Sequence, residues 1–198
     1  ELGNLDSLSN SLGSQALILK DWGRLPEAMD LHKEEERICR ELGNQDGLQR
    51  SLGNQALILS DWGRLPEAMD LLKEQERICR ELGNLDGLQG SLGNQALILS
   101  AWGRLQEAMD LHKEKERICR ELGNLNSLQK SLGNQANILS AWGRLQEAMD
   151  LHKEQERICR ELGNLDSLSN SLGNQALILK AWGRLLEAMD LLKEQERI

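Results

Sequence analysis

The feature that most constrains this chain is a sequence repeat with a period of 40 residues. The stretch SLGNQALILSDWGRL, which begins at Ser51, recurs with few changes from Ser11, Ser91, Ser131 and Ser171. Self-similarity at a fixed period of this size is typical of a solenoid, in which each small unit contacts only its neighbours. The sequence therefore predicts one continuous array of repeats in place of one or two globular domains.

The composition indicates helices and a soluble protein. The 198 residues include no Phe or Tyr and only two Pro, and they are rich in residues that favour helices. The formal charge of −8 is spread over the repeats, which argues against nucleic acid as the main partner. No apolar run approaches the roughly 20 residues that span a bilayer, and no signal segment is recognised. We expect a cytoplasmic protein with no membrane partner and no cofactor.

The period divides the chain, as a single solenoid of residues 1–198, into repeats 5–44, 45–84, 85–124, 125–164 and 165–198. Residues 1–4 match the end of a repeat, so we interpret them as the tail of a truncated preceding repeat. Both ends resemble cuts through a longer array without the polar caps that solenoids need. Apolar side chains such as Leu191, Leu192 and Ile198 would then be exposed, and end-to-end homo-association becomes possible.

Each repeat is predicted to contain two antiparallel helices, at about 46–62 and 66–82 in the second copy. Asn44 is a good N-cap, Gly83 is a good residue to follow a helix, and Gly63 separates the two helices. The expected core of this repeat has helical spacing: Leu48, Leu52, Ala56 and Leu59, then Ala68, Leu71, Leu72, Ile78, Cys79 and Leu82.

Two further residue types recur in every copy. Gly53 and its counterparts cost roughly 1 kcal/mol inside a helix, which suggests that two helices approach closely there. Trp62 and its counterparts are expected to fill the bend between the two helices, with stacking on a ligand as the less favoured alternative.

The repeat resembles a known family. Leu52, Ala56, Gly63 and Ala68, with Leu65 two residues after the glycine, are similar to the tetratricopeptide repeat (TPR). The similarity is greatest to the variant of about 40 to 42 residues found in kinesin light chains and bacterial signalling proteins. The resemblance covers the whole chain.

The resemblance implies an all-α, right-handed superhelix whose inner, concave wall is made mainly by the first helices. Members of the family hold peptides or other proteins on that wall without chemistry. This sequence departs from the family at one position of the second helix, where a long polar side chain replaces a small residue. That position holds Glu35, Gln75, Lys115, Gln155 and Gln195.

The stripe opposite the buried face of the first helix is the predicted binding surface, because much of the variation between copies falls on it. Its positions are Asn10, Ser14, Leu17, Asp21; Arg50, Asn54, Leu57, Asp61; Gly90, Asn94, Leu97, Ala101; Lys130, Asn134, Asn137, Ala141; and Asn170, Asn174, Leu177, Ala181.

Four asparagines on this stripe, Asn54, Asn94, Asn134 and Asn174, form the best functional candidate. A primary amide donates and accepts, so it can bind both the N–H and the C=O of an extended peptide. The alternative is that each amide bonds only within its own hairpin or to the next repeat.

Other positions on the stripe leave two interpretations open. Asn137 replaces the Leu of every other copy, which indicates either a local contact or drift on an exposed surface. Arg50 and Lys130 could pair with acidic groups of a ligand, or they could simply be solvated. Leu57, Leu97 and Leu177 complete the candidate groove.

The sequence contains no recognisable active site. His32, His112 and His152 exchange with Leu in the other copies, which indicates half-buried packing positions. The cysteines, Cys39, Cys79, Cys119 and Cys159, are expected to be buried and unpaired, because equivalent points of stacked repeats are too far apart for a disulfide. We expect no catalytic residue and no metal site.

The sequence supports three hypotheses about function. The first is a non-enzymatic scaffold that binds a protein or peptide in the concave groove. The second is an idealised or engineered structural array without a specific ligand, prone to end-to-end association. The third is the sensor segment of a multidomain signalling protein.

Overall fold

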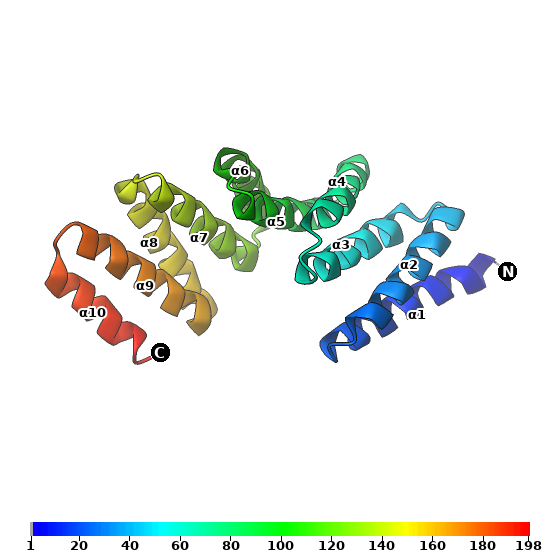
Figure 1. The fold of residues 1–198 in the computed structure, drawn as a ribbon, viewed down its shortest axis with the longest axis horizontal. Helices are drawn as coiled ribbons and strands as arrows, with labels where there is room; N and C mark the ends of the chain where they lie inside the picture. Colours follow the sequence, from blue (N-terminus) through cyan, green and yellow to red (C-terminus); the bar gives the residue numbers. More distant parts are fainter. Residues whose placement is uncertain (1) are drawn as a thin grey trace. The chain divides into compact units, whose positions relative to one another are not determined.

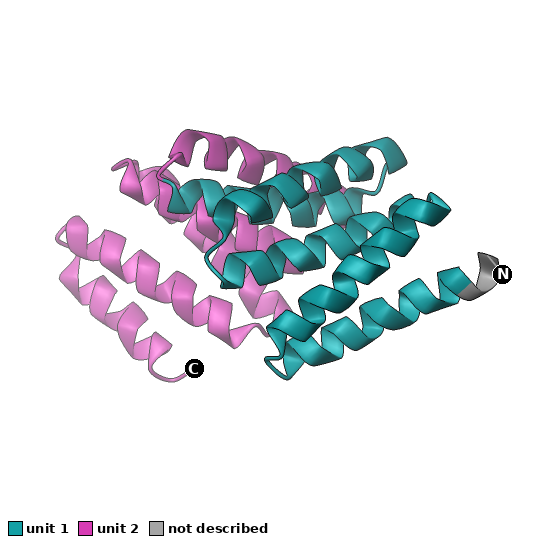
Figure 2. Ribbon diagram, turned by 45° about the vertical axis from the view of Figure 1, so that its right-hand side comes forward, with its two compact units in different colours: residues 1–102 teal, residues 103–198 magenta. Residues whose placement is uncertain are grey.

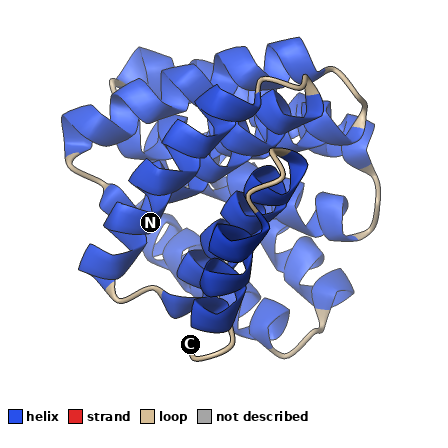
Figure 3. Cartoon of the chain, turned by 90° about the vertical axis from the view of Figure 1, so that its left-hand side faces the viewer, coloured by secondary structure: helices blue, strands red, loops and turns tan. Residues whose placement is uncertain are grey.

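A computed structural model describes residues 2–198, with side chains from residue 5 onwards, and this part of the chain is entirely helical apart from short turns (Figure 3). Ten helices alternate as the first and second helices of five pairs (Figure 1). The first helices are α1 (Leu2–Asp21), α3 (Gln45–Asp61), α5 (Leu85–Ala101), α7 (Leu125–Ala141) and α9 (Leu165–Ala181). The second helices are α2 (Leu25–Leu42), α4 (Leu65–Leu82), α6 (Leu105–Leu122), α8 (Leu145–Leu162) and α10 (Leu185–Gln195).

The predicted helix ends are confirmed to within one residue. The Asn44 side chain accepts a hydrogen bond from the Gly47 backbone N–H at 2.9 Å, which satisfies a donor that the first turn of α3 leaves free. Gly83 follows α4 in the left-handed conformation, with φ +64°, which glycine adopts without steric cost. The same two devices recur at the later repeat boundaries.

The turn within each hairpin is equally short. Trp62, Gly63 and Arg64 join α3 to α4, and Gly63 has φ +72°. The guanidinium of Arg64 pairs with the carboxylate of Glu67 in the first turn of α4. A negative charge at this end of a helix interacts favourably with the helix dipole.

At the N-terminus, α1 begins at Leu2 and so runs through Gly3 and Asn4, where later copies have a break between helices. Glu1, part of the interpreted tail of a preceding repeat, lies outside the described residues. The interpretation of residues 1–4 as such a tail stays a prediction.

The helices group into two compact units, residues 1–102 and 103–198 (Figure 2). The first unit contains α1 to α5, and the second contains α6 to α10. Within each unit a second helix packs against its own first helix and against the first helix of the next repeat. The predicted all-α fold of stacked helix hairpins is thereby confirmed.

The apolar core runs across each boundary between repeats. In the first unit, Cys39 of α2 packs with Leu48 and Leu52 of α3 and Ile78 of α4, all at most 3% exposed. In the second unit, Cys119, Leu128, Leu132 and Ile158 repeat this cluster. One hairpin cannot form such a core alone, so each repeat depends on its neighbour.

Polar side chains add a second layer to each boundary. The Ser51 hydroxyl donates to the His32 carbonyl at 2.7 Å, and Gln55 Nε2 donates to Glu36 Oε2 at 2.7 Å. Arg40 bridges Glu36 of its own repeat, at 2.8 Å, and Glu74 of the next repeat, at 2.9 Å. Because buried polar groups are costly without partners, these contacts favour one alignment of the repeats.

The predicted core of the second repeat needs two corrections. Leu82 is 46% exposed, because it lies in the last turn of α4 beside the break at Gly83. Leu71 is only half-buried, at the edge of the cluster around Cys39. The sequence interpretation also missed Ile58, which is fully buried on α3.

The repeated glycine of the first helix faces a side chain and not a helix backbone. A Cβ atom on Gly53 would lie 2.5 Å from Nε2 of Gln75, which is 8% exposed on α4. Gly13 faces Glu35 and Gly133 faces Gln155 in the same way. The glycine therefore makes room for the long polar residue by which this sequence departs from the family it resembles.

Trp22 and Trp62 do not fill the hairpin bend as predicted, whereas Trp142 and Trp182 are half-buried. Trp22 is 69% exposed and Trp62 is 37% exposed, and each directly follows the last residue of a first helix. Backbone hydrogen bonds close this bend. Gly63 N–H donates to the Ser60 carbonyl at 2.9 Å, and Arg64 N–H donates to the Leu59 carbonyl at 2.8 Å.

Candidate functional site

The predicted stripe of the first helices is accessible to solvent in both units. Asn54 and Asn94 are half-buried on α3 and α5, and Asn134 and Asn174 are half-buried on α7 and α9. Ala56 and Leu59 lie on the opposite face of α3 and are buried in the core, as the helical spacing predicts.

In the first unit the stripe borders a cavity of about 480 Å³. Four predicted site residues line this cavity: Arg50, Asn54, Leu57 and Asn94. Gln75 and Gly53 belong to its lining as well, and Asp46 and Asp86 are its carboxylates. The structure thus brings together side chains that lie up to 48 positions apart in the sequence, from Asp46 to Asn94.

A second cavity of about 290 Å³ continues along the same two helices. It shares Leu57 and Asn94 with the first cavity and also includes the predicted residue Leu97, which is 51% exposed. The rest of its lining is mostly apolar: Ala56, Ser60, Asp61, Leu65, Leu72, Ile98 and Ala101. Together the two cavities form what we call the α3–α5 groove.

The asparagine amides of this groove are not engaged by the protein. Among the described residues, neither Asn54 nor Asn94 has a side-chain hydrogen-bond partner. The neighbouring Gln55, in contrast, bonds to the preceding repeat through Glu36. The sequence left open whether the asparagine amides bind a ligand or bond to a neighbouring repeat. In this groove the neighbouring glutamine makes the bond between repeats, and Asn54 and Asn94 do not.

Arg50 is exposed at one end of the groove. Its Nη2 donates to Oδ1 of Asn10 at 3.3 Å, which links the stripes of α1 and α3. The contact is a weak one between exposed side chains, so the guanidinium can still meet another group.

In the second unit, Asn137 of α7 and Asn174 of α9 meet. Nδ2 of Asn174 donates to Oδ1 of Asn137 at 3.2 Å. Lys130 is exposed one helical turn before Asn134, and Leu177 is 65% exposed on α9. The sequence suggested either a local contact or drift at Asn137, and the structure shows a local contact with Asn174.

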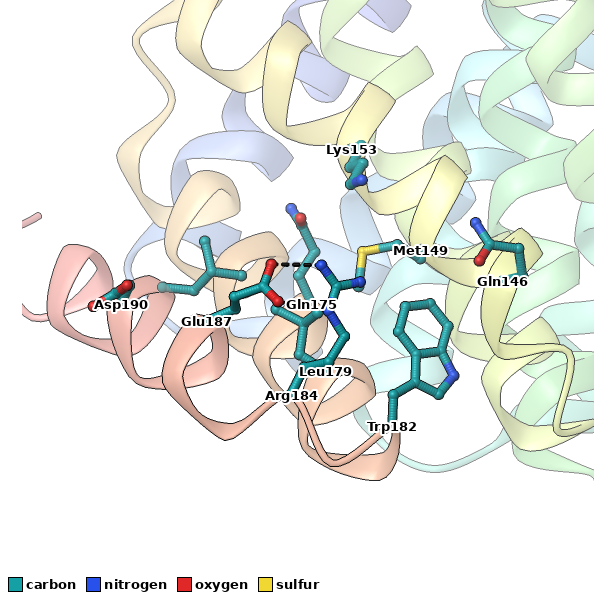
Figure 4. Close-up of a pocket in the computed structure, with 10 residues that line it drawn as sticks. Gln146, Met149, Lys153, Gln175, Leu179, Trp182, Arg184, Glu187 and Asp190 are labelled. Atoms are coloured by element: carbon teal, nitrogen blue, oxygen red, sulfur yellow. Dashed lines mark hydrogen bonds and ion pairs between the residues drawn. The ribbon is translucent and has the colours of Figure 1, made fainter.

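The sequence interpretation missed a cavity of about 330 Å³ on another face of the second unit, where α8, α9 and α10 meet (Figure 4). Met149 and Trp182 border it, and the ion pair between Arg184 and Glu187, at 2.6 Å, lies beside them (Figure 4). Eight lining residues recur 40 positions earlier around a cavity of about 290 Å³: Met109, Lys113, Gln135, Leu139, Arg144, Glu147, Asp150 and Leu151. These eight residues are identical in the two copies, and this recurrence was the sequence signal that could have indicated the cavity.

The titratable groups in the core are poorly suited to chemistry. Burial lowers the pKa of His112 to about 4 and raises the pKa of the Cys79 thiol to about 11. The three histidines are fully buried, at 0 to 1% exposure, and not half-buried as predicted. The four cysteines are buried, and none of them forms a disulfide bond within the described residues, as predicted.

Within residues 2–198, no group of three or more His, Cys, Asp and Glu side chains is arranged to hold a metal ion. In the same range, no helix is both long enough and apolar enough to cross a membrane.

No protein-family model matches the sequence, and no curated protein matches it by sequence. Solved structures do match. The structure of BtubC (BKLC) from P. vanneervenii has a TM-score of 0.86 at 19% identity, over 98% of this chain and 80% of the other. The nearly identical TPR-like repeats of a putative kinesin light chain from Podosopora anserina have a TM-score of 0.75 at 22% identity, over 95% and 93% of the two chains.

A Rap protein complexed with Competence and Sporulation Factor is also similar, with a TM-score of 0.77 at 12% identity, over 99% of this chain and 57% of the other. Similarity at these identities concerns the fold. The chain is a TPR-like α-solenoid repeat protein, as the spacing of Leu52, Ala56, Gly63 and Ala68 predicted.

Proposed function

We propose that this chain is a non-enzymatic scaffold that holds an extended peptide segment on the exposed stripes of its first helices. The observation that carries the proposal is the α3–α5 groove, whose lining includes Arg50, Asn54, Leu57, Asn94 and Leu97. Helical spacing in the sequence predicts these same five residues independently of any cavity.

The amides of Asn54 and Asn94 suit the backbone of such a segment. Each lies half-buried at the cavity wall without a partner among the described residues, so a ligand does not have to displace an internal hydrogen bond. An extended peptide exposes N–H and C=O groups that a primary amide can pair with simultaneously.

The apolar part of the groove suits a side chain of the same segment. Leu57 and Leu97 flank a cavity of about 290 Å³, which is comparable to the lower range of small ligand pockets. Burying an aliphatic side chain there contributes roughly 1.5–3 kcal/mol before the cost of ordering the peptide.

The similar Rap structure contains Competence and Sporulation Factor, which is compatible with a binding role for a chain with this fold. A binding role also agrees with the burial of the histidines and cysteines, since groups such as Cys79 are kept neutral at physiological pH and away from any ligand.

An array of immobilised ten-residue peptides tests the proposal. We expect the wild-type chain to bind a subset with apolar residues, and the double substitution Asn54→Ala and Asn94→Ala to weaken that binding about tenfold, because two amide contacts are lost.

The matched control is Glu81→Ala, which removes an exposed side chain of α4 in the same unit. This variant should bind as the wild type does. Equal binding by the asparagine double variant would remove the α3–α5 groove from consideration.

A second candidate function is a structural array that associates end to end. Leu186 is 83% exposed and Met189 is 52% exposed on α10, whereas Met149, the counterpart of Met189 one repeat earlier, is 2% exposed. Such side chains offer an apolar surface to a second copy of the chain, or to another partner of similar shape.

A further inference from the structure

The boundary between α6 and α7 differs in charge from the equivalent boundary in the first unit. Three residues of the first unit define the comparison: Gln75 on α4 and Asp86 and Gly90 on α5, all of which line the cavity of about 480 Å³. The residues 40 positions later are Lys115 on α6 and Asn126 and Lys130 on α7. Three substitutions at one place thus replace one negative charge by two positive charges.

The other boundaries confirm that this charge is local. Between α2 and α3 the same positions hold Glu35, Asp46 and Arg50, and between α8 and α9 they hold Gln155, Asp166 and Asn170. Each of these sets has a net charge of −1. Among the four boundaries, only the one between α6 and α7 is cationic.

Lys115 of α6 is a buried cation. It is 9% exposed, and within residues 103–198 it forms no ion pair or hydrogen bond. Burial lowers the pKa of its ammonium group; the nearby Cys119 opposes this shift, and the charge of Lys130 adds to it. An ammonium group held out of water needs a carboxylate or a comparable acceptor to offset the loss of hydration.

The neighbouring histidine supports this interpretation. In the equivalent positions, His32 Nδ1 bonds to Glu35 at 2.9 Å and His152 Nδ1 bonds to Gln155 at 3.1 Å. His112 lies one turn before Lys115, and neither of its buried ring nitrogens has a hydrogen-bond partner among the described residues. The acceptor that serves the other two histidines has been replaced by a cation.

We propose that Lys115 and Lys130 form an anion-binding site that receives a carboxylate of the bound segment. The inference deepens the proposed function and rests on it for the class of ligand, but it concerns different residues, which lie in the second unit. A carboxylate placed between α6 and α7 supplies the charge that both ammonium groups lack. The carboxylate comes from an acidic side chain or from a chain terminus.

Three blocked heptapeptides separate these sources. The first carries one glutamate at its centre, the second carries glutamine instead, and the third is the glutamine peptide with a free C-terminal carboxylate. Binding is followed by the amide shifts of α6 and α7 in NMR titrations of the full chain at up to millimolar peptide, so that weak binding is also measured.

We expect the glutamate peptide to bind about tenfold more tightly than its glutamine analogue. Lys115→Gln should abolish this preference. Glutamine already occupies the equivalent position in two other repeats, as Gln75 and Gln155, so the fold is expected to tolerate this substitution. Lys130→Asn, which matches Asn170, should reduce the preference by a smaller factor.

The matched control is Lys113→Gln, which removes the same charge from an exposed position of α6 and should keep the preference. A preference for the free C-terminus that Lys115→Gln abolishes would assign the same site to a chain terminus. Equal binding of all three peptides, no carboxylate-dependent shift, or a preference that persists in Lys115→Gln would each overturn the proposal.

The failures of the two proposals are distinguishable. Loss of affinity in the Asn54 and Asn94 double variant, with no glutamate preference anywhere, would retain the groove and reject the anion site. A glutamate preference that depends on Lys115 but not on Asn54 would retain the anion site and reject the groove.

Discussion

Asn174 donates a hydrogen bond from its side-chain amide to the amide oxygen of Asn137, across 3.2 Å between α9 and α7. In the first unit the corresponding pair is Leu57 and Asn94, which border both cavities of the α3–α5 groove. A single difference between copies therefore decides whether the stripe amide is tied to its neighbour or left open to a ligand.

Replacing Asn137 by Leu should release the Asn174 amide. Both asparagines are solvent-accessible, so we expect the free energy of unfolding to change by no more than about 0.5 kcal/mol. We expect the affinity for an extended peptide with an apolar residue to increase roughly fivefold, because an apolar contact is added while a donor is freed. Fluorescence anisotropy with a labelled array peptide measures this change.

The reverse substitution is the control. Leu57→Asn places an amide acceptor beside Asn94 and should lower the affinity for the same peptide. If neither substitution alters affinity, these positions do not contact the ligand.

Two glycines should respond to alanine in opposite directions. Gly90 lies inside α5 with nothing within 4 Å of the position that an added methyl group would take, so Gly90→Ala should stabilise the chain by about 0.5–1 kcal/mol through helix propensity. Gly63 is equally uncrowded but has φ +72°, so Gly63→Ala should destabilise it by about 1 kcal/mol. Urea unfolding of both variants measures the two effects, and shifts of the same sign would contradict them.

His112 should make the chain sensitive to mild acid. Its folded-state pKa of about 4 lies below the value of about 6.5 expected when the chain is unfolded. The unfolded chain therefore takes up the proton first, and stability that is present above about pH 6.5 is lost as the pH falls towards 4. His112→Leu, which introduces the residue found at Leu72, should reduce this loss by about 1–3 kcal/mol.

The measurement is the unfolding free energy of wild type and variant at several pH values. Their difference should grow as the pH falls through this window, whereas carboxylates common to both chains cancel. A constant difference would show that burial of His112 does not control its protonation.

Self-association through α10 makes a separate prediction. We expect the sedimentation coefficient of the chain to rise with concentration, and the double substitution Met189→Lys and Leu192→Lys to suppress the rise, because charge replaces exposed apolar surface. Leu82→Lys changes a residue of similar exposure away from α10 and serves as the control. A wild-type sedimentation coefficient that stays constant with concentration would contradict the prediction.

The sequence alone determined the repeat, the helix ends and most of the core. Asn44 and Gly83 act on backbone groups within a few residues, so their effect does not depend on the rest of the fold. The periodic spacing of Leu48, Leu52 and Ala56 likewise selects one face of one helix. Local rules were sufficient for these features.

Tertiary structure decided the features that depend on how helices lie against one another. It determined that Gly53 accommodates Gln75, that Trp62 is exposed, and that Asn137 meets Asn174. It also determined which stripe residues line a cavity. Each of these contacts joins side chains from different helices, and periodicity within a single helix specifies which face is buried but not which side chain it will meet there.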